Sequence, residues 1–155
     1  MQIKVTWGTG KADTEEGAFD KALYEAGLAN YNLIEMSSIV PEGSQVKLEQ
    51  LDTDTERYGD KAYVVLSKCL TTEEGSEAWA GLGWHYHEKE QKGVFVEEEA
   101  GSESELSTRI RKTVETLHSE RMKETGELNM KTAGIESDGR PVCAVVAALY
   151  RIESW

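Results

Sequence analysis

Residues 17–41 read GAFDKALYEAGLANYNLIEMSSIVP, and the periodicity of this stretch changes in its middle. In the first half, apolar residues are spaced three or four apart, as on one face of a helix, and Gly27 stands where a helix typically ends. The second half, residues 30–40, is typical of a strand that a proline ends. Two adjacent serines, Ser37 and Ser38, interrupt its apolar run. Because buried hydroxyl groups need partners, the pattern alone favours serines bonded to the neighbouring backbone at a strand end.

The N-terminal flank predicts a strand and the start of that helix. Ile3, Val5 and Trp7 alternate with polar residues, so they should share one face of a strand that the glycines of residues 8–10 break. Thr14 suits the N-cap of the helix, because two glutamates follow it where the helix dipole favours negative charge.

The C-terminal flank predicts a second helix and several strands. Residues 104–122 carry an apolar stripe between charged residues, formed by Leu106, Ile110, Val114 and Leu117. The other expected elements are an irregular stretch over 43–59, a buried strand over 62–66, paired strands over 78–87 and 93–99 across a polar connection at 88–92, and a hairpin of 129–137 and 141–152 that turns at Asp138-Gly139. Together they predict a single α+β domain over residues 1–155, with helices layered on sheet.

Composition indicates a globular protein with an acidic surface. The 155 residues include 29 acidic and 17 basic side chains, a formal net charge of −12, and 39% of them are hydrophobic. Nucleic acids and anionic membranes are unexpected partners, because both bind basic surfaces. The longest nearly uncharged apolar run, residues 141–150, is too short to span a bilayer, and the N-terminus lacks the features of a signal peptide. We expect a cytoplasmic protein whose acidic surface suits a cationic ligand or a salty cytoplasm.

The sequence predicts no metal site. His85 and His87 would project from one face of a strand, but zinc or copper needs a third ligand that the sequence does not indicate, so this pair is interpreted as a solvated strand end. Residues 52–56 imitate the start of a calcium-binding loop, yet the glycine and the bidentate glutamate of such a loop are missing. Cys69 and Cys143 are too few and too far apart for a disulfide framework or a thiolate site.

Several segments together resemble the pyruvoyl-dependent arginine decarboxylases. The segments that carry the resemblance are Ala-Phe-Asp at residues 18–20, Asn-Leu-Ile at 32–34, Ser-Ser-Ile-x-Pro at 37–41, GVFVE at 93–97 and the apolar strand CAVVAALY at 143–150. They cover most of the chain. Residues 17–41 are the most specific part of the resemblance, and residues 42–76 contribute little.

The resemblance implies that the chain cleaves itself between Ser37 and Ser38. In such precursors the hydroxyl of the second serine attacks the preceding carbonyl carbon and the acyl group shifts from nitrogen to oxygen. Elimination from the resulting ester leaves dehydroalanine, which hydrolyses to a pyruvoyl group and ammonia. Ser38 would become the pyruvoyl terminus of an α chain of residues 38–155, and Ser37 would end a β chain of residues 1–37. Such an attack calls for a strongly constrained turn, and Ser37 is the residue expected to shape it.

The same resemblance implies roles for three further residues. The family's pyruvoyl group condenses with the substrate amine and withdraws electrons as carbon dioxide leaves. Glu97 would then donate a proton to the carbanion, Asp20 would hold the planar guanidinium of the substrate, and Asn32 would orient the cleavage site. Taken singly, each of the three also suits an ordinary surface position. In one straight strand Asn32 and Ser38 would lie about 20 Å apart, so a bend, the chain break or a neighbouring subunit must join them.

Architecture, assembly and product are also implied by the resemblance. It predicts a layered αββα sandwich of two antiparallel-rich sheets flanked by helices, and a homotrimer or a hexamer of two stacked trimers with active sites between subunits. The predicted reaction converts L-arginine to agmatine and carbon dioxide for polyamine synthesis, with a covalent pyruvoyl group from Ser38 and no metal. Two alternatives stay open: the same self-processed fold acting on another amino acid such as histidine, or an unprocessed, non-enzymatic acidic assembly protein.

Overall fold

The computed structural model describes residues 1–87, 92–121 and 127–155, and in them the chain forms two helices and nine strands. In chain order these are β1 (Gln2–Lys11), α1 (Glu15–Glu25), β2 (Asn32–Glu35), β3 (Ile39–Val40), β4 (Gln45–Leu48), β5 (Lys61–Thr71), β6 (Glu77–His87), β7 (Lys92–Ala100), α2 (Glu103–Arg121), β8 (Glu127–Glu136) and β9 (Val142–Glu153). The predicted α+β class is confirmed.

The strands form two sheets. One has five strands in the order β2-β5-β9-β1-β4, and the other has four strands in the order β3-β7-β6-β8. All pairs of the four-stranded sheet are antiparallel. The five-stranded sheet is mixed, because its two outer pairs, β2 with β5 and β1 with β4, run parallel. The expectation of antiparallel-rich sheets is therefore confirmed for the four-stranded sheet and corrected at both edges of the five-stranded one.

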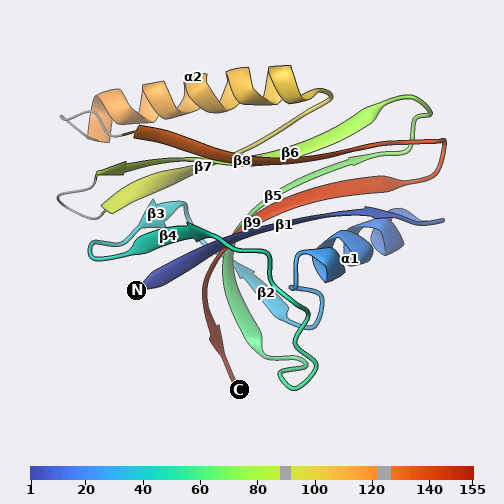
Figure 1. Cartoon of the computed structure of the whole chain (residues 1–155), viewed down its shortest axis with the longest axis horizontal. Helices are drawn as coiled ribbons and strands as arrows, with labels where there is room; N and C mark the ends of the chain where they lie inside the picture. Colours follow the sequence, from blue (N-terminus) through green and yellow to red (C-terminus); the bar gives the residue numbers. More distant parts are fainter. Residues whose placement is uncertain (88–91, 122–126) are drawn as a thin grey trace.

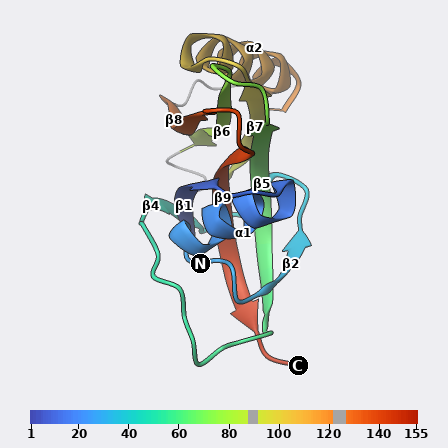
Figure 2. The same ribbon diagram turned by 90° about the vertical axis from the view of Figure 1, so that its right-hand side faces the viewer.

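The two sheets pack face to face, and each carries one helix on its outer face (Figures 1 and 2). The largest apolar core lies between the sheets, where side chains of β1, β5 and β9 meet those of β6 and β7. α1 buries Ala18, Ala22 and Leu23 against the five-stranded sheet. α2 buries Leu106 and Ile110 against the four-stranded sheet, as the predicted stripe requires. No described helix is long and apolar enough to cross a membrane.

Gly8 and Gly10 do not break β1, contrary to the expectation, and the strand continues to Lys11. α1 lies directly over these glycines. A Cβ atom at Gly10 would come within 2.1 Å of the Ala18 carbonyl oxygen, and one at Gly8 within 2.2 Å of that of Ala22. The glycines are therefore the points at which the helix backbone touches the strand, and their missing side chains allow this contact.

The predicted ends of α1 are confirmed. The Thr14 side chain accepts a hydrogen bond from the Gly17 amide at 3.1 Å, and Gly27 has a φ of +74°, the left-handed conformation that commonly follows a helix. α2 also agrees with its predicted range, except that Met122 lies outside the described residues.

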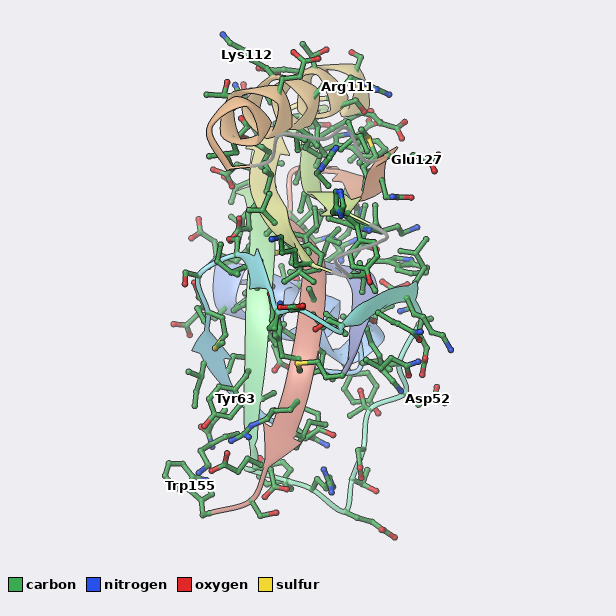
Figure 3. All side chains as sticks on the ribbon, turned by 90° about the vertical axis from the view of Figure 1, so that its left-hand side faces the viewer. Asp52, Tyr63, Arg111, Lys112, Glu127 and Trp155 are labelled. Atoms are coloured by element: carbon green, nitrogen blue, oxygen red, sulfur yellow. The ribbon has the colours of Figure 1, made fainter. Side chains whose placement is uncertain are left out.

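The predicted strand over residues 30–40 is two strands in different sheets. β2 pairs with β5 in the five-stranded sheet, whereas β3 pairs with β7 in the four-stranded sheet. Residues 36–38 carry the chain from one sheet to the other, so the two serines lie in the crossing rather than inside a strand. Figure 3 shows the chain from β2 through β3 to β4 passing in front of β5 and β9.

The predicted hairpin of residues 129–137 and 141–152 is wrong for the same reason. β8 pairs with β6 in one sheet, and β9 pairs with β5 and β1 in the other. The Asp138-Gly139 turn, with Gly139 at φ +95°, carries the chain between the stacked sheets. Turn chemistry predicts a reversal of direction, but it does not decide whether the two strands bond side by side or stack.

The remaining strands agree with the sequence in part. β6 and β7 pair antiparallel, as expected, from Trp79 opposite Ala100 to His87 opposite Lys92, and residues 88–91 of the predicted connection lie outside the described residues. β5 is longer than the predicted 62–66. Within the stretch expected to be irregular, β4 adds a short strand parallel to β1.

Candidate active site

The candidate cleavage site lies in a tight turn at the start of β3. The amide of Ile39 donates a hydrogen bond to the Ser37 carbonyl oxygen at 2.8 Å, which closes a three-residue turn centred on Ser38. The amide of Phe95, on β7, donates to the Ser38 carbonyl oxygen at 2.7 Å. Ser37 is exposed and Ser38 half-buried. Hydrogen bonds thus hold the carbonyl oxygen of the Ser37–Ser38 peptide and that of the peptide after it.

The sequence pattern alone favoured a hydrogen bond from the Ser38 hydroxyl to the neighbouring backbone, but the hydroxyl has a different partner in the structure. It donates to Glu97 Oε1 at 2.5 Å, a contact between residues 59 positions apart. Pairing of β3 with β7 makes this contact possible: Ile39 lies opposite Val94, and Glu97 follows three residues further along β7. A carboxylate is thereby aimed at the side chain that the sequence singled out.

Of the glutamates at positions 97–99, Glu97 is the one that meets Ser38. Glu98 points to the other side of β7 and accepts a hydrogen bond from Thr113 of α2 at 2.7 Å. Alternation along the strand explains the difference, because neighbouring side chains face opposite sides of a sheet. Val94 and Val96 on the same strand are buried, whereas the Glu97 side chain itself is exposed.

A pocket of about 360 Å³ opens beside this contact. β3, β7 and α2 enclose it, and its lining residues are Ser37, Ser38, Ile39, Val94, Phe95, Val96, Glu97, Thr113 and Leu117. The walls are mostly apolar, and the polar groups gather around Ser38. The pocket can therefore admit a small molecule to Ser38 and Glu97 together.

Within one chain the structure does not bring Asn32 to Ser38. Asn32 opens β2, and its side chain donates to the Gly59 carbonyl oxygen at 2.6 Å. The same carbonyl oxygen accepts a bond from the Trp155 indole at 3.0 Å. The Asn32 amide is therefore engaged with the turn that precedes β5, in a different sheet from β3.

Asp20 is also apart from Ser38. It lies exposed on α1, which packs on the outer face of the five-stranded sheet. Ser38 and Glu97 belong to the four-stranded sheet on the other side of the central core. The five-stranded sheet therefore lies between the two candidate carboxylates of one chain.

Tyr150, at the end of the apolar run on β9, belongs to the same neighbourhood, although its sequence context gives it no predicted role in the site. Its hydroxyl donates to the Ile39 carbonyl oxygen at 2.9 Å, and its ring packs edge-on against Phe95 with centroids 6.3 Å apart. Burial, and next the charge of Glu97, raise the pKa of Tyr150, which keeps the hydroxyl protonated. The signal was a tyrosine closing a buried strand, where its hydroxyl must find a partner.

The structure corrects the interpretation of His85 as solvated, because only 5% of its surface is exposed. Among the described residues, no group of three or more histidine, cysteine or acidic side chains is arranged to hold a metal ion. Cys69 and Cys143 are free thiols, and burial raises the pKa of Cys143 to about 11.

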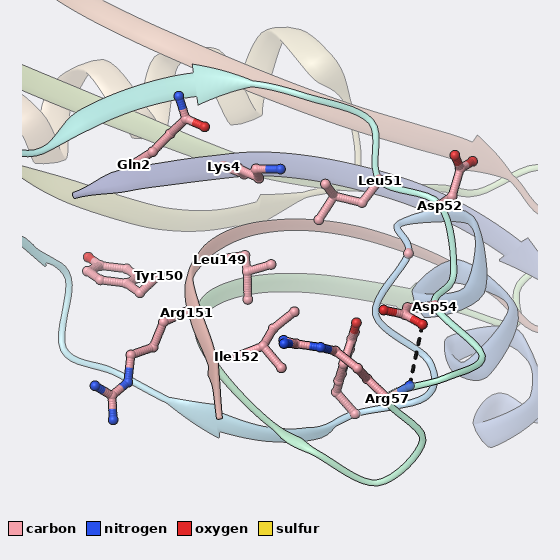
Figure 4. A pocket seen from close by; sticks show the side chains of 12 residues that line it. Gln2, Lys4, Leu51, Asp52, Asp54, Arg57, Leu149, Tyr150, Arg151 and Ile152 are labelled. Atoms are coloured by element: carbon pink, nitrogen blue, oxygen red, sulfur yellow. Dashed lines mark hydrogen bonds between the residues drawn. The ribbon is translucent and has the colours of Figure 1, made fainter. Parts of the chain in front are cut away.

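A second pocket, of about 300 Å³, lies beside the last residues of β9 (Figure 4). Charged side chains of both signs line it, namely Lys4, Asp52, Asp54, Arg57 and Arg151. The Asp54 carboxylate accepts a bond from the Arg57 amide at 3.4 Å, and burial together with Asp54 raises the pKa of Tyr31 on the pocket wall. None of the five predicted site residues lines this pocket.

Known proteins are similar in sequence to this chain along nearly its whole length. The family model for pyruvoyl-dependent arginine decarboxylases matches residues 2–154. A pyruvoyl-dependent arginine decarboxylase of Halobacterium salinarum is 30% identical over 151 residues, which cover 96% of this chain and 93% of the relative. The pyruvoyl-dependent arginine decarboxylase 2 of Archaeoglobus fulgidus is 28% identical over 148 residues, or 94% and 92% of the two chains. A shorter match, 53% over 38 residues, joins 24% of this chain to 25% of the enzyme of Methanopyrus kandleri.

Proposed function

The chain belongs to the pyruvoyl-dependent arginine decarboxylase family, a group of carboxy-lyases, and from this premise we propose its own reaction. It cleaves itself between Ser37 and Ser38, and the processed protein converts L-arginine to agmatine and carbon dioxide. The observation that carries the proposal is the hydrogen bond from the Ser38 hydroxyl to Glu97 inside an accessible pocket. This contact joins the two residues that the family resemblance pairs, from segments far apart in the sequence.

The surroundings of Ser38 fit a pyruvoyl group at that position. Ser38 lines the pocket, and its carbonyl oxygen is already bonded to the Phe95 amide, so loss of the peptide link to Ser37 would leave residue 38 anchored to β7. The group would supply a ketone that condenses with the substrate amine and accepts electrons as carbon dioxide departs.

The chain's own residues would then bind the substrate and move protons. Glu97, next to residue 38, is positioned to give a proton to the substrate carbon from which carbon dioxide leaves. The buried side chains of Val94, Phe95 and Val96 form an apolar wall that excludes water. Thr113 and Leu117 of α2 close the opposite side.

Asp20 would bind the guanidinium from a neighbouring copy of the chain. A carboxylate fits the planar guanidinium with two parallel hydrogen bonds, and in one chain Asp20 lies on the far side of the five-stranded sheet from Ser38. Exposed apolar side chains beside the crossing, Ile34, Met36 and Ile39, favour contact with another copy there. A homotrimer, or two stacked trimers, would bring Asp20 and Asn32 of one copy to Ser38 and Glu97 of the next.

The test is product analysis with the purified full-length protein. Incubation with ¹⁴C-labelled L-arginine should release labelled carbon dioxide and an equal amount of agmatine, and the Ser38→Ala variant should release neither. Parallel incubations with histidine, lysine and ornithine test the substrate. Carbon dioxide from histidine alone would replace arginine by histidine in the proposal, and no carbon dioxide from any of the four would favour a non-enzymatic assembly protein.

A further inference from the structure

Tyr150 forms a hydrogen bond with the segment of residues 37–39 around the proposed cleavage site, and the proposed function gives this bond no role. Three successive carbonyl oxygens there are each held by a donor: that of Ser37 by the Ile39 amide at 2.8 Å, that of Ser38 by the Phe95 amide at 2.7 Å, and that of Ile39 by the Tyr150 hydroxyl at 2.9 Å. Two of these donors are main-chain amides, which every residue type except proline offers. The third is a side chain, and it reaches across 111 positions from the other sheet.

Tyr150 is itself firmly placed. Only 7% of its surface is exposed, and its ring packs against Phe95, the residue whose amide holds Ser38. Between β9 and β5 the register shifts at this point: Leu149 lies opposite Val64 and Arg151 opposite Tyr63, so Tyr150 is the extra residue of a bulge. Bulges of this kind redirect a side chain and are frequent next to active sites.

We propose that Tyr150 is a positioning residue for self-cleavage, and that its hydroxyl holds the turn in which the Ile39 amide contacts the scissile carbonyl. The inference rests on the proposed function, because it presupposes cleavage between Ser37 and Ser38. Tyr150 does not touch the reacting atoms. It acts through Ile39, whose carbonyl oxygen it binds and whose amide faces the Ser37 carbonyl oxygen.

The chemistry explains why the position of that amide matters. In the first step, the Ser38 hydroxyl oxygen bonds to the Ser37 carbonyl carbon, the carbon–nitrogen bond to Ser38 breaks, and the hydroxyl proton ends on the released amino nitrogen. Negative charge develops on the Ser37 carbonyl oxygen in the course of this step. A donor that already points at the oxygen stabilises the charge without reorganisation, and the Ile39 amide is such a donor.

The Tyr150→Phe variant tests the inference, because it removes the hydroxyl and keeps the ring against Phe95. Tyr86→Phe is the matched control: Tyr86 also packs against the core between the sheets and donates to a backbone carbonyl oxygen, but that of Ser44, which is not part of the turn around Ser38. Full-length chains made by cell-free synthesis are sampled over time, and intact mass spectrometry gives the first-order rate constant of cleavage. The thermal midpoints of both variants are measured in the Ser38→Ala background, which keeps every chain uncleaved.

Loss of one hydrogen bond that orients the turn should slow cleavage by roughly tenfold in Tyr150→Phe and leave Tyr86→Phe within about twofold of wild type. If Tyr150 had only a structural role, Tyr150→Phe would lower the thermal midpoint, as Tyr86→Phe does. It would not change the rate constant of cleavage at temperatures well below that midpoint. If Tyr150→Phe unfolds at a lower temperature than the wild type, the cleavage rates are compared at a temperature where the circular dichroism of the variant shows the folded state.

The outcomes separate this inference from the proposed function. If wild-type and Tyr150→Phe chains cleave at equal rates, Tyr150 has no part in positioning, while the proposed function stands. If Tyr86→Phe slows cleavage as much as Tyr150→Phe, the effect is general to the core and the specific role is refuted. If the wild-type chain never cleaves, both the proposed function and the inference are refuted.

Discussion

Glu97 accepts a hydrogen bond from Ser38 in the structure, whereas its proposed part in decarboxylation is to donate a proton. The Glu97→Gln variant separates these properties, because glutamine keeps an acceptor oxygen for the Ser38 hydroxyl but has no proton to give at neutral pH. We expect complete self-cleavage by mass spectrometry and a loss of decarboxylation on the order of 10²–10⁴-fold in a carbon dioxide release assay.

Glu98→Gln provides the matched control for this prediction. Glu98 is the next residue on β7 but binds Thr113 on the opposite side of the strand, so this variant should keep most of its activity. Undiminished turnover in Glu97→Gln would remove Glu97 from the mechanism.

Cys143 allows a test of burial through pH. Its pKa is raised to about 11 by burial, so the folded protein keeps the thiol protonated after the unfolded chain has begun to lose its proton. The stabilisation from this thiol is therefore fully present below the ordinary thiol pKa and is lost as the pH rises towards 11. Relative to Cys143→Ala, the free energy of unfolding should fall by roughly 1–2 kcal/mol between pH 8 and pH 10.

Urea unfolding of both proteins in the Ser38→Ala background measures this difference in a single intact chain. An equal pH dependence with and without Cys143 would show that the thiol is exposed to solvent in the folded state.

At the scale of the elements, the contact of α1 with β1 depends on two glycines. In Gly10→Ala the new methyl group would clash with the helix backbone at Ala18, which cannot move aside as a flexible side chain could. We expect the free energy of unfolding to fall by about 1–3 kcal/mol, measured by urea unfolding in the Ser38→Ala background. Gly101→Ala is the control, because nothing lies within 4 Å of a Cβ atom there. Equal stability of the two variants would contradict the close packing of α1.

The helices and most strands could be predicted from local sequence patterns. The predictions were wrong where contacts between elements decide which structure forms. Residues within one or two helical turns determine the Thr14 cap, the end of α1 at Gly27 and the apolar stripe of α2. These features can therefore be predicted from local sequence. The breaks at Gly8 and Gly10 were mispredicted because the helix that covers these glycines is a tertiary contact. Residues 30–40 and the β8–β9 turn were mispredicted because alternation does not tell which sheet a strand joins.

The candidate site shows the same division. The Ser-Ser motif and its resemblance to a family pointed to Ser38 and Glu97, and the structure brings these two together. Asp20 and Asn32 came from the same resemblance but lie apart from them in one chain. Tyr150 was missed because its contact with Ile39 depends on the stacking of the two sheets, which no local pattern records.

At the scale of the whole molecule, the separation of Asp20 from Glu97 predicts that two inactive variants can restore each other. In a mixed oligomer of Asp20→Ala and Glu97→Gln chains, some sites receive the intact Asp20 of one copy and the intact Glu97 of another. Coexpression with random assembly should recover roughly a quarter of wild-type activity, assayed at low arginine concentration, where each variant alone is inactive.

The control pairs Glu97→Gln with Ser38→Ala. Ser38 and Glu97 of the same chain are in direct contact, so no mixture of these two variants contains a complete site, and activity should stay absent. Activity in this control, or none in the Asp20 mixture, would contradict a site divided between copies as proposed.

Self-cleavage between Ser37 and Ser38 precedes every other proposed step, and intact mass spectrometry of the purified protein after prolonged incubation tests it. We expect two masses: residues 1–37 with a free carboxyl end, and residues 38–155 lighter by about 17 Da than the same residues with an unmodified terminal serine, because a pyruvoyl group replaces that serine with loss of ammonia. A single mass for the uncut 155-residue chain would contradict self-cleavage.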